Sequence, residues 1–256
     1  MISAMSLRGL RKNFGQKRAV DDLNLEVRQG CLFGLVGPNG AGKTTTLSMA
    51  TGLLRPDAGT ASVLDHDVWS DPVRAKELMG VLPDGLRLFD RLSGGELLRY
   101  VGLIRRVPLP DIEARSAELL SALGLADDRD TLVVEYSAGM TKKIGLACAL
   151  IHAPRLLILD EPFEAVDPVS GETIRSILRD FVRGGGTVVL SSHVMELVES
   201  LCDELAVVAQ GRVLAAGTLD DVRAGSTLQQ RFLELVGFQA GAEGGLAWLQ
   251  SSSDSN

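Results

Sequence analysis

The sequence contains 256 residues, with 26 Lys or Arg against 33 Asp or Glu, which gives a formal net charge of −7. A chain of this length forms one large or two small domains and can bury a core without disulfides or metals. Its 45% apolar and 23% charged residues exclude a collagen-like or wholly disordered chain. The acidic balance predicts no nucleic-acid partner, because binding to nucleic acid depends on clustered Lys and Arg.

Three widely spaced cysteines, Cys31, Cys148 and Cys202, bear on the cellular location. Their odd number and spacing favour buried free thiols in a reducing compartment. No stretch approaches the roughly 18 uninterrupted apolar residues of a membrane span, and the N-terminus lacks the apolar core of a secretory signal. We therefore expect a cytoplasmic chain, so that any membrane-spanning partner is a separate polypeptide.

Along the chain, short runs rich in Val, Leu and Ile alternate with longer segments of helical period, which predicts a parallel sheet wrapped by helices. The five basic residues from Arg8 to Arg18 favour a solvated hairpin or loop over a nucleic-acid patch. The predicted elements are an antiparallel strand at 22–27, a buried strand at 32–36, a helix at 43–54 and an antiparallel strand near 61–64.

The middle of the chain changes to helical period, which predicts a helical subdomain inserted between two strands of one sheet. Its predicted helices cover 96–106, 112–123 and 140–152. Strands at 156–159 and 187–190, a hairpin of 205–208 with 212–215, and an amphipathic segment at 228–236 follow. We expect a core with the β subdomain at 1–83 and 153–225, the helical subdomain at 84–152, and a short helix with a flexible tail at 226–256.

The first chemical motif is GPNGAGKT at 37–44, between the predicted strand at 32–36 and the helix. It matches the G-x-x-x-x-G-K-[ST] pattern, whose backbone N–H groups and helix N-terminus converge on phosphate. Lys43 is expected to reach the β- and γ-phosphate oxygens, and Thr44 to hold Mg²⁺. A plain glycine turn is the alternative. The predicted nucleotide-binding residues here are Gly37, Asn39, Gly40, Ala41, Gly42, Lys43, Thr44 and Thr45.

Two carboxylates, Asp160 and Glu161, end the predicted buried strand at 156–159. Ligands of open α/β sheets bind at such strand ends. Asp160 is therefore the candidate Mg²⁺ ligand, directly or through water, and Glu161 is placed to orient and deprotonate an attacking water. Alternatively, both acids cap the next helix. Together with the loop at 37–44, they indicate a P-loop NTPase.

A third motif, YSAGM at 136–140, precedes the predicted helix that leads to the Asp160 strand. Together with GPNGAGKT and LLILDEP, it resembles the nucleotide-binding subunit of ABC transporters, whose signature is usually LSGGQ and, in one exporter-like branch, Y-S-x-G-M. The resemblance covers about residues 5–236. It implies an α/β fold with a P-loop NTPase core, a mostly parallel sheet, an N-terminal antiparallel β subdomain and an inserted helical subdomain.

A second candidate signature, LSGGE at 92–96, matches the common form more closely. Ser93, however, lies 67 residues before Asp160, whereas Ser137 lies 23 before it. Because one helix and a turn fill the shorter gap, we assign the signature to Ser137. Ser93 and Glu96 instead fit the S-x-x-E pattern of a helix capping box.

The resemblance implies further site residues. Phe14 matches the aromatic that stacks on adenine, with a core aromatic at a strand end as the alternative. His193 follows the predicted strand at 187–190 and matches the switch histidine that contacts the γ-phosphate. Asp84 stands where the family most often carries glutamine, and its carboxylate can accept from metal-bound water.

The resemblance also implies partners. In the family, Ser137 and Gly139 complete the ATP site of a second chain, and the loop at 165–167 touches that chain. This implies a homodimer or heterodimer of nucleotide-binding subunits that encloses two ATP molecules with Mg²⁺. Separate transmembrane permease subunits are expected to dock near 84–91, through Arg87, Leu88 and Phe89.

The sequence therefore predicts an ATP-hydrolysing subunit that powers transport from the cytoplasmic face of the cell membrane. The resemblance favours export, because the YSAGM signature and the segment at 228–236 are similar to those of exporter-type members. One alternative is a soluble ABC-type ATPase without a transport function. Another is a module that binds ATP without hydrolysing it, against which the intact Glu161 and His193 argue.

Overall fold

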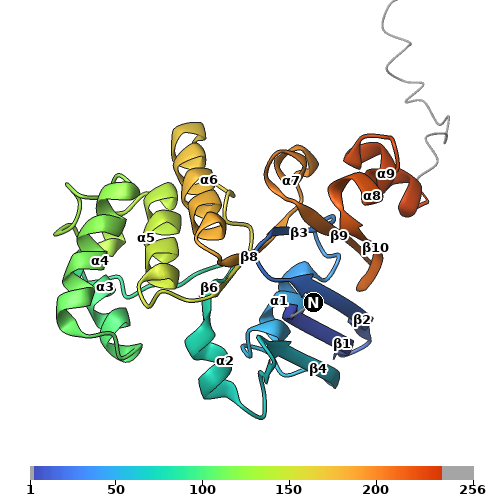
Figure 1. The fold of residues 1–256 in the computed structure, drawn as a ribbon, viewed down its shortest axis with the longest axis horizontal. Coiled ribbons are helices and arrows are strands. Elements are labelled where there is room, and N and C mark those ends of the chain that lie inside the picture. The colour runs from blue at the N-terminus through green and yellow to red at the C-terminus, as the bar shows by residue number, and fades with distance from the viewer. Residues whose placement is uncertain (1–2, 238–256) are drawn as a thin grey trace, which may run out of the picture.

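The larger of two β-sheets forms the centre of the computed structural model, which describes residues 3–237 (Figure 1). Its strands are β3 (Leu32–Val36), β6 (Met79–Leu82), β7 (Leu156–Leu159), β8 (Thr187–Ser192), β9 (Glu204–Ala209) and β10 (Arg212–Thr218). They lie in the order β10-β9-β3-β8-β7-β6. All neighbours are parallel except the hairpin of β9 and β10. The mostly parallel sheet is therefore confirmed.

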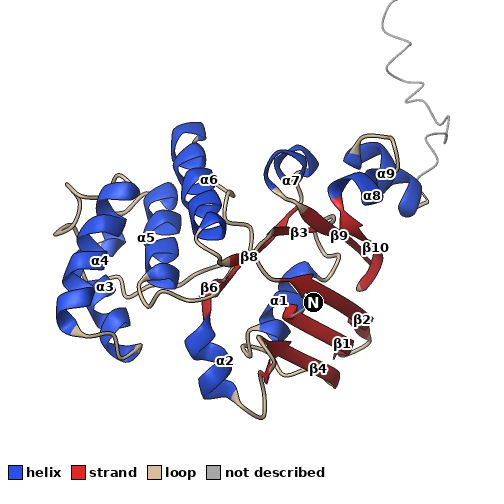
Figure 2. Cartoon of the chain, viewed as in Figure 1, coloured by secondary structure: helices blue, strands red, loops and turns tan. Residues whose placement is uncertain are grey.

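The smaller sheet is antiparallel and lies beside the first (Figure 2). Its strands are β1 (Ser3–Phe14), β2 (Lys17–Arg28), β4 (Ala58–Val63) and β5 (His66–Asp67), in the order β2-β1-β4-β5. The basic cluster lies on the β1–β2 hairpin, where its arginines form ion pairs with acids of β2: Arg8 with Glu26, Arg11 with Asp22 and Arg18 with Asp21. The predicted solvated hairpin is confirmed.

Helices cover the large sheet and fill the inserted segment. They are α1 (Lys43–Ala50), α2 (Pro72–Leu78), α3 (Gly94–Ile104), α4 (Leu109–Ala122), α5 (Ala138–Leu150), α6 (Pro168–Arg183), α7 (Met195–Leu201), α8 (Leu219–Arg223) and α9 (Leu228–Leu235), with a 3₁₀ turn at Val133–Glu135. Helices α3, α4 and α5 stand together on the left of Figure 1. The predicted insertion of helices between strands of one sheet is confirmed, because all three lie in the chain between β6 and β7.

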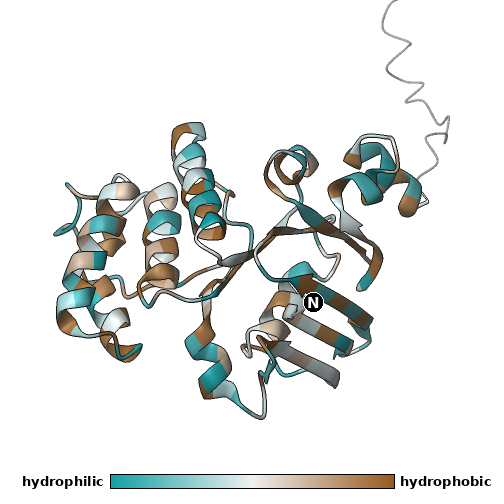
Figure 3. Cartoon of the chain, in the orientation of Figure 1, coloured by the Kyte–Doolittle hydropathy of each residue, from teal (hydrophilic) through white to brown (hydrophobic). Residues whose placement is uncertain are grey.

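The large sheet has an apolar core on each face. All five residues of β3 are buried, and successive side chains point to opposite faces. Leu32 and Val36 join the core shared with the helical segment, while Phe33 and Leu35 join the core shared with α1 and the small sheet. The central strands are accordingly among the most hydrophobic parts of Figure 3. Burial on both faces explains why these strands show no polar alternation in the sequence.

Helix α5 packs closely on β6 because glycine stands at the contacts. A Cβ atom on Gly145 of α5 would lie 2.8 Å from Leu82 Cδ1 of β6, and one on Gly80 of β6 would lie 2.1 Å from the carbonyl oxygen of Ala149 of α5. The predicted capping box precedes α3: Ser93 Oγ accepts from Glu96 N, and Glu96 Oε2 accepts from Ser93 N. LSGGE is therefore a helix cap in this fold, as predicted.

Some predicted boundaries are wrong. Helix α1 ends at Ala50 instead of residue 54, because Gly52 has φ +74° and the N–H groups of Leu53 and Leu54 donate to Ser48 O. Helix α6 was not predicted, although Asp167 and Pro168 carry its start signal, with Asp167 Oδ1 accepting from Val169 N. The predicted flexible tail after residue 237 lies outside the described residues.

Candidate active site

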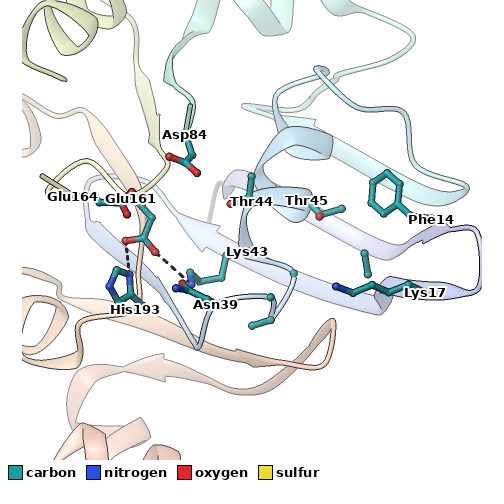
Figure 4. Close-up of a pocket in the computed structure, with 14 residues that line it drawn as sticks. Phe14, Lys17, Asn39, Lys43, Thr44, Thr45, Asp84, Glu161, Glu164 and His193 are labelled. Carbon is teal, nitrogen blue, oxygen red and sulfur yellow. Dashed lines mark hydrogen bonds and ion pairs between the residues drawn. The ribbon is translucent and has the colours of Figure 1, made fainter. Parts of the chain in front are cut away.

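A cavity of about 430 Å³ opens at the carboxyl ends of the parallel strands. The loop at 37–42 follows β3, Glu161 follows β7 and His193 follows β8, and these strands are neighbours in the order β3-β8-β7. The strand order therefore brings together motifs that are far apart in sequence. The lining residues, shown in Figure 4, are Phe14, Lys17, Ala19, Asn39, Gly40, Ala41, Gly42, Lys43, Thr44, Thr45, Asp84, Glu161, Glu164 and His193.

The loop before α1 requires glycine for steric reasons. Gly40 and Gly42 have φ of +80° and +104°, a region that other residues rarely adopt. A Cβ atom on Gly37 would lie 2.1 Å from Val208 O, and one on Gly42 would lie 2.5 Å from Ala19 O. The loop turns the backbone N–H groups and the N-terminus of α1 toward the cavity, an arrangement suited to phosphate.

Lys43 carries the positive charge at the base of this cavity. Its side chain is only 6% exposed, and Nζ donates to Gly37 O at 2.8 Å and to Pro38 O at 3.3 Å. The same Nζ lies 3.4 Å from Glu161 Oε1. A buried ammonium needs such partners, and a phosphate could replace the carboxylate among them.

Asp160 is held beneath the cavity by Ser191, a residue outside the predicted site. Ser191, buried in β8, donates through Oγ to Asp160 Oδ1 and accepts from Glu161 N at 2.9 Å. Burial raises the pKa of Asp160, while hydrogen bonds from Ser191 and Thr44 act in the opposite direction. Ser191 thus fixes both acids. The one sequence feature that could have predicted this role is the position of Ser191 near the end of β8, the strand beside β7.

Glu161 lies between a lysine and a histidine (Figure 4). His193 Nδ1 is 3.1 Å from Glu161 Oε2, and Lys43 Nζ faces the other carboxylate oxygen. Its backbone has φ +46°, which is uncommon for a residue with a side chain. This conformation aims the carboxylate at the cavity and away from a helix cap, so the capping alternative for Glu161 is wrong.

The oxygen donors around Thr44 suit a hard divalent cation. Thr44, Asp84 and Asp160 line a small second cavity of about 40 Å³ between α1 and β6. Hydroxyl and carboxylate oxygens are typical Mg²⁺ ligands. Within residues 3–237, no group of three or more His, Cys, Asp or Glu could hold a metal ion, so a cation here would depend on phosphate and water oxygens for its remaining ligands.

Ser137 and Gly139 lie outside this cavity, at the start of α5. Ser137 Oγ accepts from Met140 N at 3.2 Å and caps the helix. A Cβ atom on Gly139 would lie 3.9 Å from both Ala165 O and Asp167 Oδ2. The two signature residues therefore do not contribute to the cavity of their own chain.

Phe14 stands at the opposite end of the cavity from His193 (Figure 4). Phe14 is 51% exposed to solvent, so the alternative that it is a core aromatic is wrong. Lys17 and Glu164 also line the cavity and were not predicted. Gly37 supports the loop but does not line the cavity itself.

Several known proteins are similar to this chain in sequence or in fold. A family model described as ABC transporter matches residues 20–164. The daunorubicin/doxorubicin resistance ATP-binding protein of Streptomyces peucetius is 38% identical over 232 residues, which cover 91% of this chain and 70% of that protein. The Nod factor export ATP-binding protein I of Ralstonia nicotianae is 39% identical over 213 residues, covering 83% and 66%. A solved ATP-binding subunit of an ABC transporter superposes with a TM-score of 0.86 and 28% identity, covering 91% of this chain and all of that one.

Proposed function

Because this chain belongs to the ABC transporter family, as an ATP-binding subunit whose ATPase activity drives transport, we propose that Lys43, Glu161 and His193 form its catalytic centre. The observation that carries this proposal is the position of Glu161, with one carboxylate oxygen 3.4 Å from Lys43 Nζ and the other 3.1 Å from His193 Nδ1. A carboxylate placed next to a phosphate-binding loop can accept a proton from a water molecule that attacks the γ-phosphate.

Each residue then has a distinct task. The loop amides and Lys43 bind the phosphate oxygens of ATP, and Lys43 neutralises negative charge that develops there. Phosphate competes with Glu161 for Lys43, which frees the carboxylate to orient water while His193 holds its other oxygen. Phe14 presents a ring face to adenine at the far end of the cavity. The nucleotide-binding set is Gly37, Asn39, Gly40, Ala41, Gly42, Lys43, Thr44 and Thr45.

We also assign a Mg²⁺ site to Thr44, Asp84 and Asp160. When bound, Mg²⁺ would polarise the phosphate and offset its charge. The oxygen donors of the three residues and their shared small cavity support this assignment. Asp160 receives a hydrogen bond from Ser191 Oγ and lines the same small cavity as Thr44, so its carboxylate is held in place before any ligand binds.

A second copy of an ATP-binding subunit, identical or related, is proposed to complete each site. Ser137 and Gly139 begin α5 but do not line the cavity of their own chain, which supports a role toward the nucleotide of a partner. The helical subdomain at 84–152 would then move as a unit relative to the core at 1–83 and 153–225. ATP binding would close the dimer, and hydrolysis would open it.

The shared site is tested by ATP turnover of the purified full chain across a series of protein concentrations. If two chains complete each site, specific activity rises with concentration until dimers saturate. Activity measured per chain that stays constant over a range in which sedimentation shows monomers becoming dimers would contradict the shared site. A Ser137→Ala variant is the companion measurement, because it should weaken the concentration dependence without removing the cavity.

Membrane subunits are proposed to dock on an apolar surface at the edge of the helical subdomain. Phe89, Tyr100, Leu103 and Ile104 are all exposed, and the Phe89 and Tyr100 rings pack edge to face with centroids 5.0 Å apart. Within residues 3–237, no helix is long and apolar enough to cross a membrane. A peripheral position on the cytoplasmic face fits this surface, and relatives named for resistance and for Nod factor export support outward transport.

Replacing Phe89 with Ala tests this docking surface. Phe89 is 56% exposed and lies outside the nucleotide cavity, so ATP turnover of the isolated chain should not change. Transport by the assembled complex should fall roughly tenfold or more, because a buried aromatic anchor contributes strongly to an interface. The measurement is substrate efflux from cells that carry the complex, with Val73→Ala, which changes an exposed apolar residue of α2, as control. Unchanged efflux would refute the assignment.

A further inference from the structure

We infer that Lys142, on helix α5, is a positioning residue for Glu161 and thereby connects the signature helix to the catalytic carboxylate. Lys142 Nζ donates to the backbone carbonyl oxygen of Glu161 at 3.1 Å. The two residues belong to different parts of the fold, since α5 is in the helical segment and Glu161 follows β7 of the large sheet. This inference rests on the proposed catalytic role of Glu161.

Glu161 needs support from outside its own segment. Its φ of +46° is a conformation that costs a non-glycine residue free energy and persists only where the surroundings hold it. Two side chains hold its backbone: Ser191 Oγ accepts from its N–H at 2.9 Å, and Lys142 Nζ donates to its C=O. Because Ser191 is in the core and Lys142 is in the helical segment, the direction of the carboxylate depends on both.

Lys142 is itself held in place. Its side chain is only 15% exposed, and Nζ lies 4.0 Å from Asp84 Oδ1. Asp84 provides the opposite charge that a partly buried ammonium requires. Helix α5 has little freedom to slide here, because Gly145, one turn further along, fits against Leu82 and Leu86 with no space for a Cβ atom. The ammonium is therefore a fixed support for the Glu161 carbonyl.

The geometry gives a physical route from the dimer contact to the chemistry. Ser137 and Gly139 begin α5, and Lys142 follows about one helical turn later. If the nucleotide of a partner chain contacts Ser137 and rotates α5, Lys142 moves with the helix. The Glu161 peptide, which is hydrogen-bonded to Lys142, would then move as well. Asp84, which replaces the glutamine typical of this loop, joins the same contact through its ion pair with Lys142.

The test compares Lys142→Met with Lys142→Arg and with the neighbouring Lys143→Met in the full chain. Within residues 3–237, Lys143 forms no ion pair with a carboxylate, so Lys143→Met is the matched control. Lys142→Met should lower kcat for ATP roughly tenfold, because misplacement of a catalytic group slows chemistry, while the Kd for ATP stays within about threefold of wild type. Lys142→Arg should recover most of the lost kcat, since guanidinium can donate to the same carbonyl.

The outcomes separate this inference from the proposed function. Unchanged kcat in Lys142→Met, with Glu161→Gln inactive, overturns the positioning role and leaves the catalytic role of Glu161 intact. A loss of ATP affinity as large as the loss of kcat also overturns it, because a positioning residue should not change ground-state binding. An equal loss of kcat in Lys143→Met would also overturn it, because the effect would then come from the charge of α5 in general and not from the contact of Lys142 with Glu161. If Glu161→Gln turns over ATP like wild type, the proposed function itself fails.

Discussion

Replacing Glu161 with Gln is expected to lower ATP turnover by roughly 10²- to 10⁴-fold, the usual contribution of a general base. Gln has nearly the same shape as Glu but cannot accept a proton from water. Lys43 keeps its hydrogen bonds to Gly37 O and Pro38 O in this variant, so ATP binding is retained. Phosphate release at saturating ATP measures the effect, and ATP-bound dimers should accumulate.

The matched control for this variant is Glu172→Gln. Glu172 is exposed on α6 and pairs with Arg175 and Arg179 of the same helix, away from the cavity. The Glu172→Gln substitution removes one carboxylate charge without changing the site, so the ATP turnover of this variant should equal that of wild type. If Glu161→Gln retains more than about a tenth of wild-type turnover, Glu161 is not the general base.

Replacing Lys43 with Ala should weaken ATP binding and turnover together, by roughly 10²-fold or more, because a positioned cation at the phosphates acts in both the ground state and the transition state. The side chain is almost fully buried, and its ammonium is the cavity charge nearest Glu161. Its removal leaves Glu161 Oε1 without its cationic partner, so a negative charge is no longer balanced where phosphate must bind. Calorimetry of ATP binding measures the affinity.

The control is Lys76→Ala, on the exposed side of α2. This variant changes the net charge by the same amount, so it separates the local effect of Lys43 from a general electrostatic one. A Lys43→Ala chain that binds ATP with wild-type affinity would mean that the loop amides alone hold the phosphates. Thermal unfolding of both variants shows whether the fold is retained.

The sequence by itself determined the local chemistry of this protein. GPNGAGKT predicts a phosphate loop because glycine, lysine and a helix start are all encoded in adjacent residues. The strands at 32–36 and 156–159 were predicted because each is a short apolar run buried on both faces. The S-x-x-E pattern at Ser93 likewise predicted its own hydrogen bonds, which join atoms three residues apart.

Only the tertiary structure decided which residues meet across the sheet. The order β3-β8-β7 places Ser191 between the phosphate loop and the acids and brings His193 to Glu161, although 32 residues separate the last two. The contact of Lys142 with the Glu161 carbonyl depends on how α5 packs on β6, and nothing local to Lys142 encodes it. Motifs specify chemistry through neighbouring residues, whereas the pairing of distant strands and helices follows from burial of the whole core.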